Sequence, residues 1–331
     1  MREPIFLTPA FRQKIWGGRK LKTELNYNIP EGSVGEAWVI SAYKDNSSVV
    51  SSGKYKGVTL RKLYQDHPEL FGNPEDKEFP LLVKFLDAND NLSVQVHPDD
   101  EYARIHENDS GKTESWYVLH AEPGAQLIYG HNAKNKEELK KMIDSGEWEE
   151  LFHYVPVKTG DFFYVPAGTV HALTKGIMVI ETQQSSDVTY RLYDWDRVDE
   201  KTGKKRKLHI DKSLDTIKVP FENPNIAPVV KNIKDAKITI LAKPPLSPHF
   251  YLWQIDINGK FDWSLDQHPY LLVSVIQGEG KFISDDKEYQ IKLGTNFIIP
   301  NGLKKFTFIG KNLRLVVSAP VDDGTSKKEK N

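Results

Sequence analysis

An internal repeat constrains the fold of this chain more than any other feature of the sequence. Residues 160–171 read GDFFYVPAGTVH and residues 294–305 read GTNFIIPNGLKK, with glycine, proline and glycine at the same spacing. Each copy predicts a strand, a sharp Pro-x-Gly turn and a second strand, because proline fixes φ and glycine permits unusual backbone conformations. A looser match pairs residues 120–130 with residues 277–286. Repeated units of this kind predict a mainly β chain of two jelly-roll barrels with a few short helices.

A stretch rich in proline and asparagine separates the two copies. Residues 220–228 read PFENPNIAP, which is typical of a linker. We therefore expect a first domain at residues 1–225, which also carries helical segments, and a second jelly-roll domain at residues 226–320. Residues 321–331 read VDDGTSKKEKN and are expected to form a flexible polar tail.

The composition excludes several classes of function. The 331 residues carry 45 basic and 46 acidic side chains, a balance that gives no reason to expect nucleic acid or a membrane as partner. The chain has no cysteine, so disulfides, thiolate metal sites and cysteine nucleophiles are ruled out. No apolar run approaches the roughly 20 residues that span a bilayer, and the N-terminus does not resemble a signal peptide. We expect a soluble, cytoplasmic protein.

The stretch Ser93-Val94-Gln95-Val96-His97-Pro98 predicts a strand with one polar face. Side chains alternate along a strand, so Val94 and Val96 point one way while Ser93, Gln95 and His97 point the other. Pro98 cannot donate to a ladder and is expected to end the strand. The polar face is compatible with an ordinary half-buried strand, and equally with a metal or substrate site inside a barrel.

Two further residues favour the metal site. Glu114 and His171 lie on other predicted strands, which a jelly roll brings close to Gln95 and His97. Two imidazoles, one carboxylate and one amide oxygen form a ligand set for a borderline divalent ion. Zn²⁺ is the first choice, and manganese, iron or cobalt could substitute. Each histidine taken alone would more simply be a structural residue.

The two halves differ at the positions where this chemistry would occur. The repeat ends in His171 in the first half but in Lys305 in the second. Apolar residues at 271–273 stand near the position that corresponds to Glu114. We therefore predict that the first domain is the catalytic, metal-binding one and that the second is metal-free.

The sequence resembles a known family at several of these motifs. The Gly-Pro-Gly-His spacing resembles the second conserved motif of the cupin superfamily. Gln95-Val96-His97-Pro98, Lys112-Thr113-Glu114 and His171 together resemble type I mannose-6-phosphate isomerase in its short bacterial form, without a large helical insertion. The stretches FPLLVKFLDANDNLSVQVHPDD and SSDVTYRLYDW strengthen the resemblance, which covers most of residues 1–320. One departure is Thr113, where many relatives have proline.

The resemblance implies an isomerase that interconverts mannose 6-phosphate and fructose 6-phosphate through a cis-enediol. It also implies one Zn²⁺ per chain, held by Gln95, His97, Glu114 and His171. The arginine that matches Arg191 is regarded in the family as catalytic or substrate-binding. The predicted catalytic residues are Arg191, Lys112 and Asp187, and the general base stays open between Asp187, Lys112 and a metal-bound water.

Four other residues are candidate substrate contacts in the predicted pocket. Ser93 resembles a phosphate contact of the family, and Lys84 and Glu36 are charged residues inside apolar runs. Trp16 precedes a Gly-Gly turn and could form part of a pocket rim. Each has an ordinary alternative: Lys84 could extend to the surface, Glu36 could face water, and Trp16 could simply pack. Asp187 and Arg191 could likewise be a surface ion pair.

Two other functions remain open at this level. An iron-dependent cupin oxygenase usually presents two histidines spaced H-x-H, whereas this chain has Gln95 at the first position. A non-catalytic sugar-phosphate-binding cupin would keep the metal and the ligand but not the turnover. The sequence leaves open the physiological metal, the strictness for mannose 6-phosphate and the direction of the pathway. We expect a monomer or weak homodimer.

Overall fold

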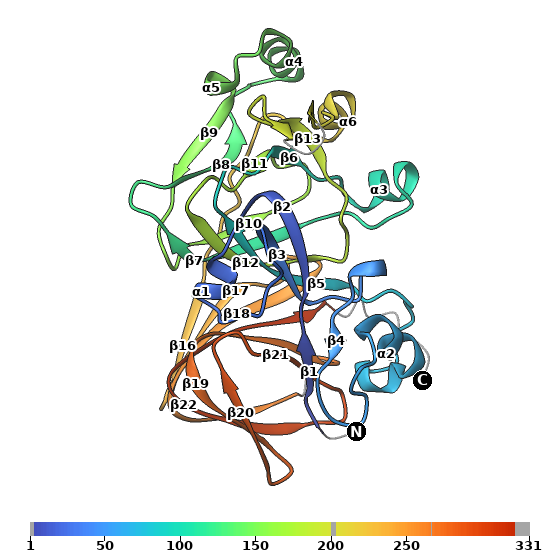
Figure 1. Cartoon of the computed structure of the whole chain (residues 1–331), viewed down its shortest axis with the longest axis vertical. Coiled ribbons are helices and arrows are strands. Elements are labelled where there is room, and N and C mark those ends of the chain that lie inside the picture. Colours follow the sequence, from blue (N-terminus) through green and yellow to red (C-terminus); the bar gives the residue numbers. More distant parts are fainter. Residues whose placement is uncertain (1–2, 200–202, 266, 322–331) are drawn as a thin grey trace.

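The computed structural model describes residues 3–199, 203–265 and 267–321, and antiparallel strands dominate it (Figure 1). The predicted mainly β fold is confirmed. Among the described residues, three larger sheets form the body of the molecule, and β14 (Val198–Asp199) pairs with β15 (Lys204–Lys205) in a separate two-stranded sheet. Most of the predicted tail, residues 322–331, lies outside the described residues.

Sheet I contains the strands of the second half of the chain together with two short strands from the N-terminal region. In spatial order it runs β16 (Val229–Ile233), β17 (Ala236–Ala242), β18 (Phe250–Ser264), β22 (Lys305–Pro320), β19 (Leu271–Ser284), β21 (Asn296–Ile299), β1 (Ile5–Thr8) and β4 (Val49–Val50), with β20 (Lys287–Lys292) paired to β19.

Sheets II and III belong to the first half of the chain. Sheet II runs β10 (Phe162–Val165), β7 (Glu114–Ala121), β12 (Ile177–Gln184), β5 (Leu81–Ala88), β2 (Ala10–Gly18) and β3 (Val34–Ile40), with a further pairing between β3 and β5. Sheet III runs β13 (Tyr190–Tyr193), β6 (Val94–Val96), β11 (His171–Ala172), β8 (Gln126–His131) and β9 (Phe152–Pro156).

The described helices are all short and lie in the first 220 residues. They are α1 (Lys20–Thr23), α2 (Leu60–Asp66), α3 (Asp100–His106), α4 (Lys136–Ser145), α5 (Trp148–Leu151) and α6 (Ile210–Thr216), with the 3₁₀ turns η1 (Lys44–Asn46) and η2 (Pro68–Phe71). The side chains of Thr59 and Asp99 cap α2 and α3 by accepting main-chain N–H bonds, as residues of these types do. None of these helices is long and apolar enough to cross a membrane.

Sheets II and III face each other and enclose the polar interior of the first half. The rings of Trp116 on sheet II and His171 on sheet III lie 5.3 Å apart, and Tyr129 on sheet III donates a hydrogen bond to the carbonyl of Tyr164 on sheet II. On the outer face of sheet III, Val94 and Val96 pack in an apolar cluster with side chains of α4 and α5. The alternation along β6 thus separates an apolar outer face from a polar inner one, as the sequence predicts.

A continuous hydrophobic core joins the two halves of the chain. One cluster contains Val83 and Phe85 of sheet II together with Leu252, Leu272 and Val316 of sheet I. All eight residues of β5 are buried, because one face of this central strand meets that core and the other meets the interior. This explains why its sequence, LLVKFLDA, does not alternate.

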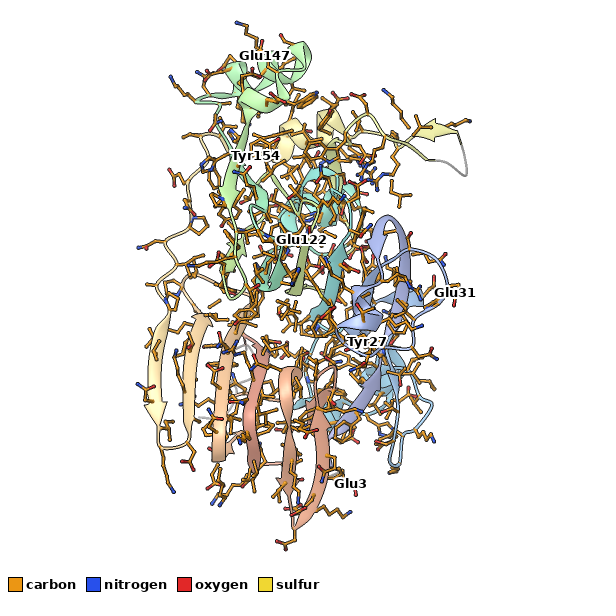
Figure 2. All side chains as sticks on the ribbon, turned by 60° about the vertical axis from the view of Figure 1, so that its left-hand side comes forward. Glu3, Tyr27, Glu31, Glu122, Glu147 and Tyr154 are labelled. Carbon is orange, nitrogen blue, oxygen red and sulfur yellow. The ribbon has the colours of Figure 1, made fainter. Side chains whose placement is uncertain are left out.

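The N-terminal segment ties the halves together as well. β1 pairs with β21 of sheet I, so a strand of the first half completes the sheet of the second. Tyr27, labelled in Figure 2 between the two halves, donates its hydroxyl proton to the carbonyl of Gly294 and accepts a bond from Asn296. The division near residue 226 stays a prediction, and the contacts across it are extensive.

The aromatic core of sheet I generates a stability prediction. Phe282 is fully buried and its ring lies 5.2 Å from both Phe297 and Phe308. Phe282→Ala should lower the free energy of unfolding by about 3–5 kcal/mol, because it removes buried surface and leaves a cavity. Urea denaturation would measure the change. Ile309→Ala, at a residue 38% exposed, is the control and should change it by less than about 0.5 kcal/mol. Equal effects of the two substitutions would contradict this packing.

Candidate metal centre

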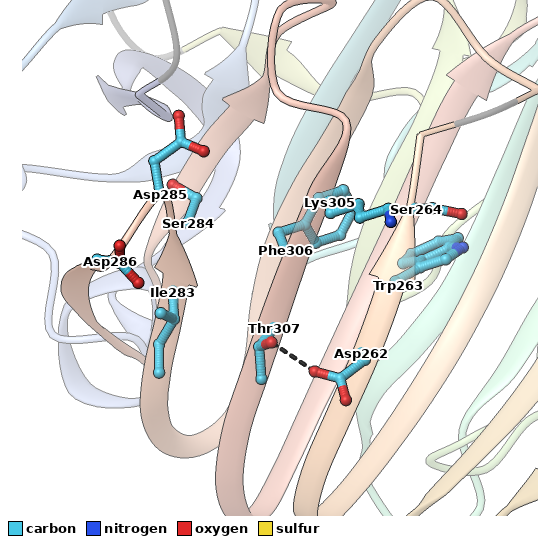
Figure 3. Close-up of a pocket in the computed structure, with 10 residues that line it drawn as sticks. All are labelled: Asp262, Trp263, Ser264, Ile283, Ser284, Asp285, Asp286, Lys305, Phe306 and Thr307. Atoms are coloured by element: carbon cyan, nitrogen blue, oxygen red, sulfur yellow. Dashed lines mark hydrogen bonds between the residues drawn. The ribbon is translucent and has the colours of Figure 1, made fainter.

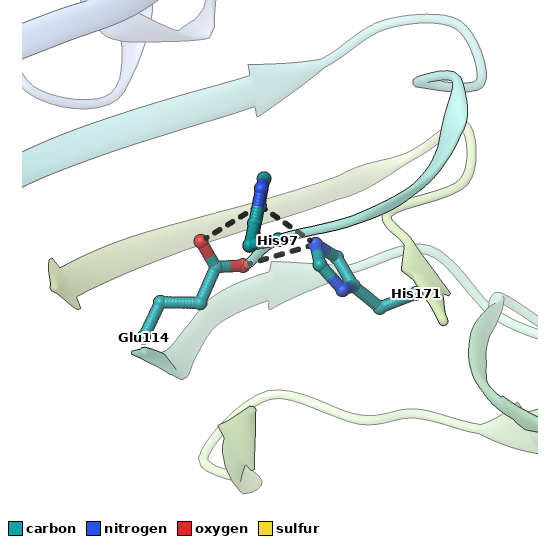
Figure 4. Close-up of side chains that lie close together, drawn as sticks. All are labelled: His97, Glu114 and His171. Carbon is teal, nitrogen blue, oxygen red and sulfur yellow. Dashed lines mark hydrogen bonds and ion pairs between the residues drawn. The ribbon is translucent and has the colours of Figure 1, made fainter. Parts of the chain in front are cut away.

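Three strands bring the predicted metal ligands together. Gln95 lies on β6, His97 directly follows that strand, Glu114 begins β7 and His171 begins β11. Gln95 and His171 are direct partners in the ladder between β6 and β11, so their side chains share the inner face of sheet III. Glu114 reaches them from sheet II on the opposite side (Figure 4).

The donor atoms of these residues converge on one point. His97 Nε2 lies 3.2 Å from His171 Nε2 and 3.4 Å from Glu114 Oε2, while His171 Nε2 lies 3.3 Å from Glu114 Oε1. The side-chain amide of Gln95 approaches to 3.3 Å from the same nitrogen of His171. Because the two ends of an amide are exchangeable by rotation, Gln95 can present its oxygen there.

The surroundings keep both imidazoles neutral and oriented. His171 Nδ1 lies 2.9 Å from the carbonyl oxygen of Thr169, a contact that places the ring proton on Nδ1 and leaves the Nε2 lone pair facing the cluster. Burial and, next, the nearby ammonium of Lys112 lower the pKa of His97 to about 3. Burial also lowers the pKa of His171. Neutral imidazole is the form that binds metal ions.

Lys112 places a cation beside the same donor atoms. Its Nζ lies 2.5 Å from Glu114 Oε2 and 2.9 Å from His97 Nε2, inside the protein. Burial opposes the charge of each partner, but the contact outweighs it: the pKa of Glu114 is lowered well below its usual value, with Lys112 the main cause, and Glu114 raises the pKa of Lys112. The carboxylate is therefore ionised at neutral pH.

The arrangement fits a divalent cation. Two Nε2 lone pairs face each other at 3.2 Å, which is favourable only when a proton or a cation lies between them. Glu114 Oε1 is buried with no hydrogen-bond donor among the described residues. Within that part of the chain, only His97, Glu114 and His171 bring three such ligand atoms within 4.8 Å of one another. Two nitrogens and a carboxylate match the preferences of zinc and its neighbours.

Arg191 lies next to the cluster on sheet III. It is the ladder partner of Gln95 in the pairing of β13 with β6, so the two side chains share the inner face. Its Nη1 donates to the carbonyl of Lys207 at 2.8 Å, and its Nε is buried without a partner among the described residues. Arg191 therefore has a buried donor for which the described residues supply no acceptor.

Four residues that are successive ladder partners form a row across sheet II. Trp38, Lys84, Glu181 and Trp116 are successive ladder partners on β3, β5, β12 and β7. The ammonium of Lys84 lies 4.6 Å from the ring centre of Trp38 and 3.5 Å from Glu181 Oε2. Lys84 is only 3% exposed, so it points into the interior and does not extend to the surface.

Glu36 lies beside this row. It is 7% exposed and accepts a bond from Trp38 Nε1 at 2.6 Å, and its Oε1 lies 3.0 Å from Lys14 Nζ. Burial alone would raise its pKa, but the charges of Lys14 and Lys84 outweigh burial and lower the pKa to about 2. Glu36 is thus a buried carboxylate with paired charge, and it does not face water.

The remaining predicted residues lie at different depths. Ser93 is buried directly before β6. Trp16 is 4% exposed and packs in an apolar cluster with Leu86 and Trp116. Asp187 is exposed, and its charge raises the pKa of Lys112 less than the charges of Glu114 and Glu181 do. The roles of these residues in substrate binding and catalysis stay predictions.

Glu181 is a site residue that the sequence analysis missed. It accepts a bond from Trp116 Nε1 at 3.0 Å, and burial and the charge of Glu114 raise its pKa. The signal was present, since Glu181 directly follows the apolar run IMVI and begins a polar stretch within the same buried strand. Only the register of β12 against β5 shows that Glu181 faces Lys84.

The corresponding position of the second half carries no such cluster among the residues that the structure describes. Lys305, which takes the place of His171 in the repeat, is exposed at the start of β22 and lines an open hollow with Asp262, Trp263 and Asp286 (Figure 3). Thr307 donates to Asp262 beside it. That the second half holds no metal stays a prediction.

Comparison with known proteins decides the family. A profile for the catalytic domain of type I phosphomannose isomerase matches residues 5–120, and one for the cupin domain of mannose-6-phosphate isomerase matches residues 245–320. The mannose-6-phosphate isomerase of Streptococcus mutans is 49% identical over 318 residues, which cover 96% of this chain and 98% of the relative. The chain belongs to the type I phosphomannose isomerase family.

Other members of this family agree in sequence and in fold. Mannose-6-phosphate isomerase ManA of Bacillus subtilis is 48% identical over 309 residues, covering 93% of this chain and 96% of the relative. The crystal structure of a mannose 6-phosphate isomerase from Bacillus subtilis superposes with a TM-score of 0.91 at 43% identity, over 96% of this chain and 99% of that one. The resemblance noted in the sequence motifs is therefore confirmed over nearly the whole chain.

The ion pair between the buried Glu36 and the partly exposed Lys14 generates a prediction about acid stability. A carboxyl group whose pKa falls from 4.5 to about 2 on folding adds up to about 3 kcal/mol of stability, which is present above pH 4.5 and lost as the pH falls toward 2. Glu36→Gln should therefore flatten the fall of the unfolding free energy between pH 5 and pH 3. Urea denaturation at a series of pH values would measure it.

The matched control is Glu31→Gln, at an exposed glutamate in the loop before β3 (Figure 2). This variant should keep the pH dependence of the wild-type protein. A Glu36→Gln profile that runs parallel to the wild-type profile would contradict the assignment of a depressed pKa to Glu36.

Proposed function

We propose that this chain interconverts mannose 6-phosphate and fructose 6-phosphate by moving one proton between C2 and C1 through a cis-enediol. The observation that carries the proposal is the buried cluster of His97, Glu114 and His171 beside Lys112, in a member of the type I phosphomannose isomerase family. An aldose–ketose isomerase needs charge stabilisation on the sugar oxygens, a base near C1 and C2, and cations for the phosphate. The interior of the first half supplies candidates for each.

The predicted ion is Zn²⁺, one per chain, held by Gln95, His97, Glu114 and His171. Such an ion would act as a Lewis acid that stabilises negative charge developing on the sugar oxygens. The neutral imidazoles and the ionised carboxylate support this assignment. Manganese, iron and cobalt accept the same ligand types, so metal analysis of the purified protein distinguishes among them.

Lys112 and Arg191 are the two cationic side chains to which we assign substrate contacts. Lys112 lies against Glu114 Oε2 at 2.5 Å, which places its ammonium where it can donate to a sugar oxygen at the reacting end. Arg191 holds a buried, unpartnered Nε next to Gln95. Its guanidinium suits a phosphate or an anionic sugar oxygen, whereas the nearby Arg197 and Arg206 are already paired with Asp194.

We assign the proton transfer between C1 and C2 to Asp187. The other carboxylates near Lys112 already have partners, since Glu114 faces the histidines and Glu181 accepts from Trp116. Asp187 is exposed and its charge acts on the pKa of Lys112, so a substrate that reaches Lys112 from solvent would meet it. Ser93, Lys84, Glu36 and Trp16 stay predicted substrate contacts.

Two alternatives are distinguished by turnover. A non-catalytic binding protein would keep the metal and sugar phosphate but would not convert one sugar into the other. An iron-dependent oxygenase is disfavoured because the chain belongs to an isomerase family and carries Gln95 where an H-x-H site has histidine. The cytoplasmic location and the monomer or weak homodimer stay predictions.

The first prediction of this proposal concerns metal removal. A coupled assay of fructose 6-phosphate formation from mannose 6-phosphate should lose its activity after chelation and recover it when zinc is added, because the metal supplies the Lewis acid. His97→Ala should bind less zinc and lose activity, at least about 100-fold, while its circular dichroism stays native. Tight binding of sugar phosphate by the zinc-loaded protein without turnover would overturn the isomerase and leave a binding protein.

A second prediction concerns Asp187. Asp187→Asn should lower kcat by at least about 100-fold and change KM little, because it removes the proton acceptor but keeps the shape of the side chain. Steady-state kinetics would measure both constants, and zinc content should equal that of the wild-type protein. Asp144→Asn, at an exposed aspartate of α4, is the control and should keep full activity. A fully active Asp187→Asn enzyme would exclude Asp187 as the base.

A further inference from the structure

Arg191 lies on a strand that has a partner on one side only. β13 is the edge strand of sheet III, where β6 is its neighbour, and the ladder register shifts between Arg191 and Tyr193. Edge strands and irregular registers leave the backbone free to move, and a shift of one residue would turn the side chain to the opposite face. An arginine that must point steadily into the site therefore needs support on the open edge.

His209 supplies that support with two hydrogen bonds, which we call the His209 clamp. The main-chain N–H of Arg191 donates to His209 Nδ1 at 3.0 Å, and the main-chain N–H of His209 donates to the carbonyl of Arg191 at 2.8 Å. Both polar backbone groups of Arg191 are thus satisfied on the side away from β6. The first bond requires Nδ1 to carry no proton, so the ring is in the Nε2–H form.

The same segment also holds the far end of the arginine. Arg191 Nη1 donates to the carbonyl of Lys207 at 2.8 Å, two residues before His209. Arg206 fixes this segment through bonds of 2.8 Å and 2.5 Å to the two carboxylate oxygens of Asp194, just beyond β13. Together with the His209 clamp, these bonds connect one short stretch, residues 206–209, to three parts of the strand region. They are the backbone of Arg191, its guanidinium and the residue that follows β13.

His209 is itself held in place from the other side. It is the residue directly before α6, and its carbonyl accepts from the N–H of Ser213 at 2.8 Å. Its ring lies 6.3 Å from that of Tyr190, the residue preceding Arg191. The imidazole therefore connects α6 to the open edge of sheet III, on the far side of Arg191 from the neighbouring strand β6.

We propose that His209 is a positioning residue for Arg191, which fixes the direction of its guanidinium at the sugar-phosphate site by clamping the strand edge from outside. The inference rests on the proposed isomerase function, in which Arg191 contacts the substrate. In this role His209 does not touch the reacting atoms. Its effect on turnover passes entirely through Arg191.

The experiment is a double-mutant cycle with a rescue variant. His209→Ala removes the acceptor for the Arg191 N–H and should lower kcat/KM for mannose 6-phosphate about 10- to 100-fold, the range expected when a substrate-binding group is displaced by about 1 Å. His209→Asn places an amide oxygen at the same reach from the backbone as Nδ1 and should restore most of the activity. Zinc content and melting temperature are measured on each variant.

The cycle separates positioning from general damage. In an Arg191→Ala background, the further change His209→Ala should cost little, because the residue through which His209 acts is already gone. His249→Ala is the control, since His249 is also a half-buried histidine but lies in the second half of the chain. It should keep wild-type kinetics.

The outcomes distinguish this proposal from the one on which it rests. Wild-type turnover with unchanged kcat/KM in His209→Ala would overturn the positioning role alone. Equal losses from His209→Ala with and without Arg191, or no rescue by His209→Asn in a folded, zinc-containing protein, would also overturn it. Absence of turnover in the zinc-loaded wild-type protein would overturn the isomerase function and this role with it.

Discussion

The buried contact between Lys112 and Glu114 is the interaction on which the site depends. Removing an ammonium or a carboxylate from water costs several kcal/mol, and only a close opposite charge offsets that penalty. The 2.5 Å contact offsets it for both residues and holds Glu114 in the ionised form that a metal needs. Other buried charges of the first half also have partners, since Lys84 lies 3.5 Å from Glu181 and Glu36 lies 3.0 Å from the partly exposed Lys14. For Glu181 the positive partners do not outweigh burial and the charge of Glu114, which raise its pKa. The interior of the first half thus contains several charged pairs.

Antiparallel register arranges these pairs. Residues opposite each other in a ladder share a face, so one row on sheet III brings Arg191, Gln95 and His171 side by side. A second row on sheet II brings Lys84 against Glu181. In this way residues from distant parts of the chain meet, and each of them lies within a regular strand or at its end. The open edge of sheet III is where the regular pairing ends, and there His209 takes the place of a neighbouring strand.

The second half packs closely against the first. Its sheet encloses an aromatic core around Phe282, and its other face packs against sheet II in the same cluster as Val83 and Phe85. For this reason β5 is buried on both faces, and Lys84 lies inside the protein together with its ladder partners. The hollow that contains Lys305 lies at the surface and is open, in contrast with the closed cluster around His171.

The sequence by itself determined the β class, the repeat and the four candidate ligands, because these depend on local periodicity and on residue chemistry. It could not show that Lys84 turns inward to meet Glu181, that Trp16 packs against Leu86 and Trp116, or that β1 joins the sheet of the second half. Those facts depend on which strands pair and in which register. Local sequence does not specify long-range pairing, so the partners of the buried charges, and the support of Arg191 by His209, were decided only in the tertiary structure.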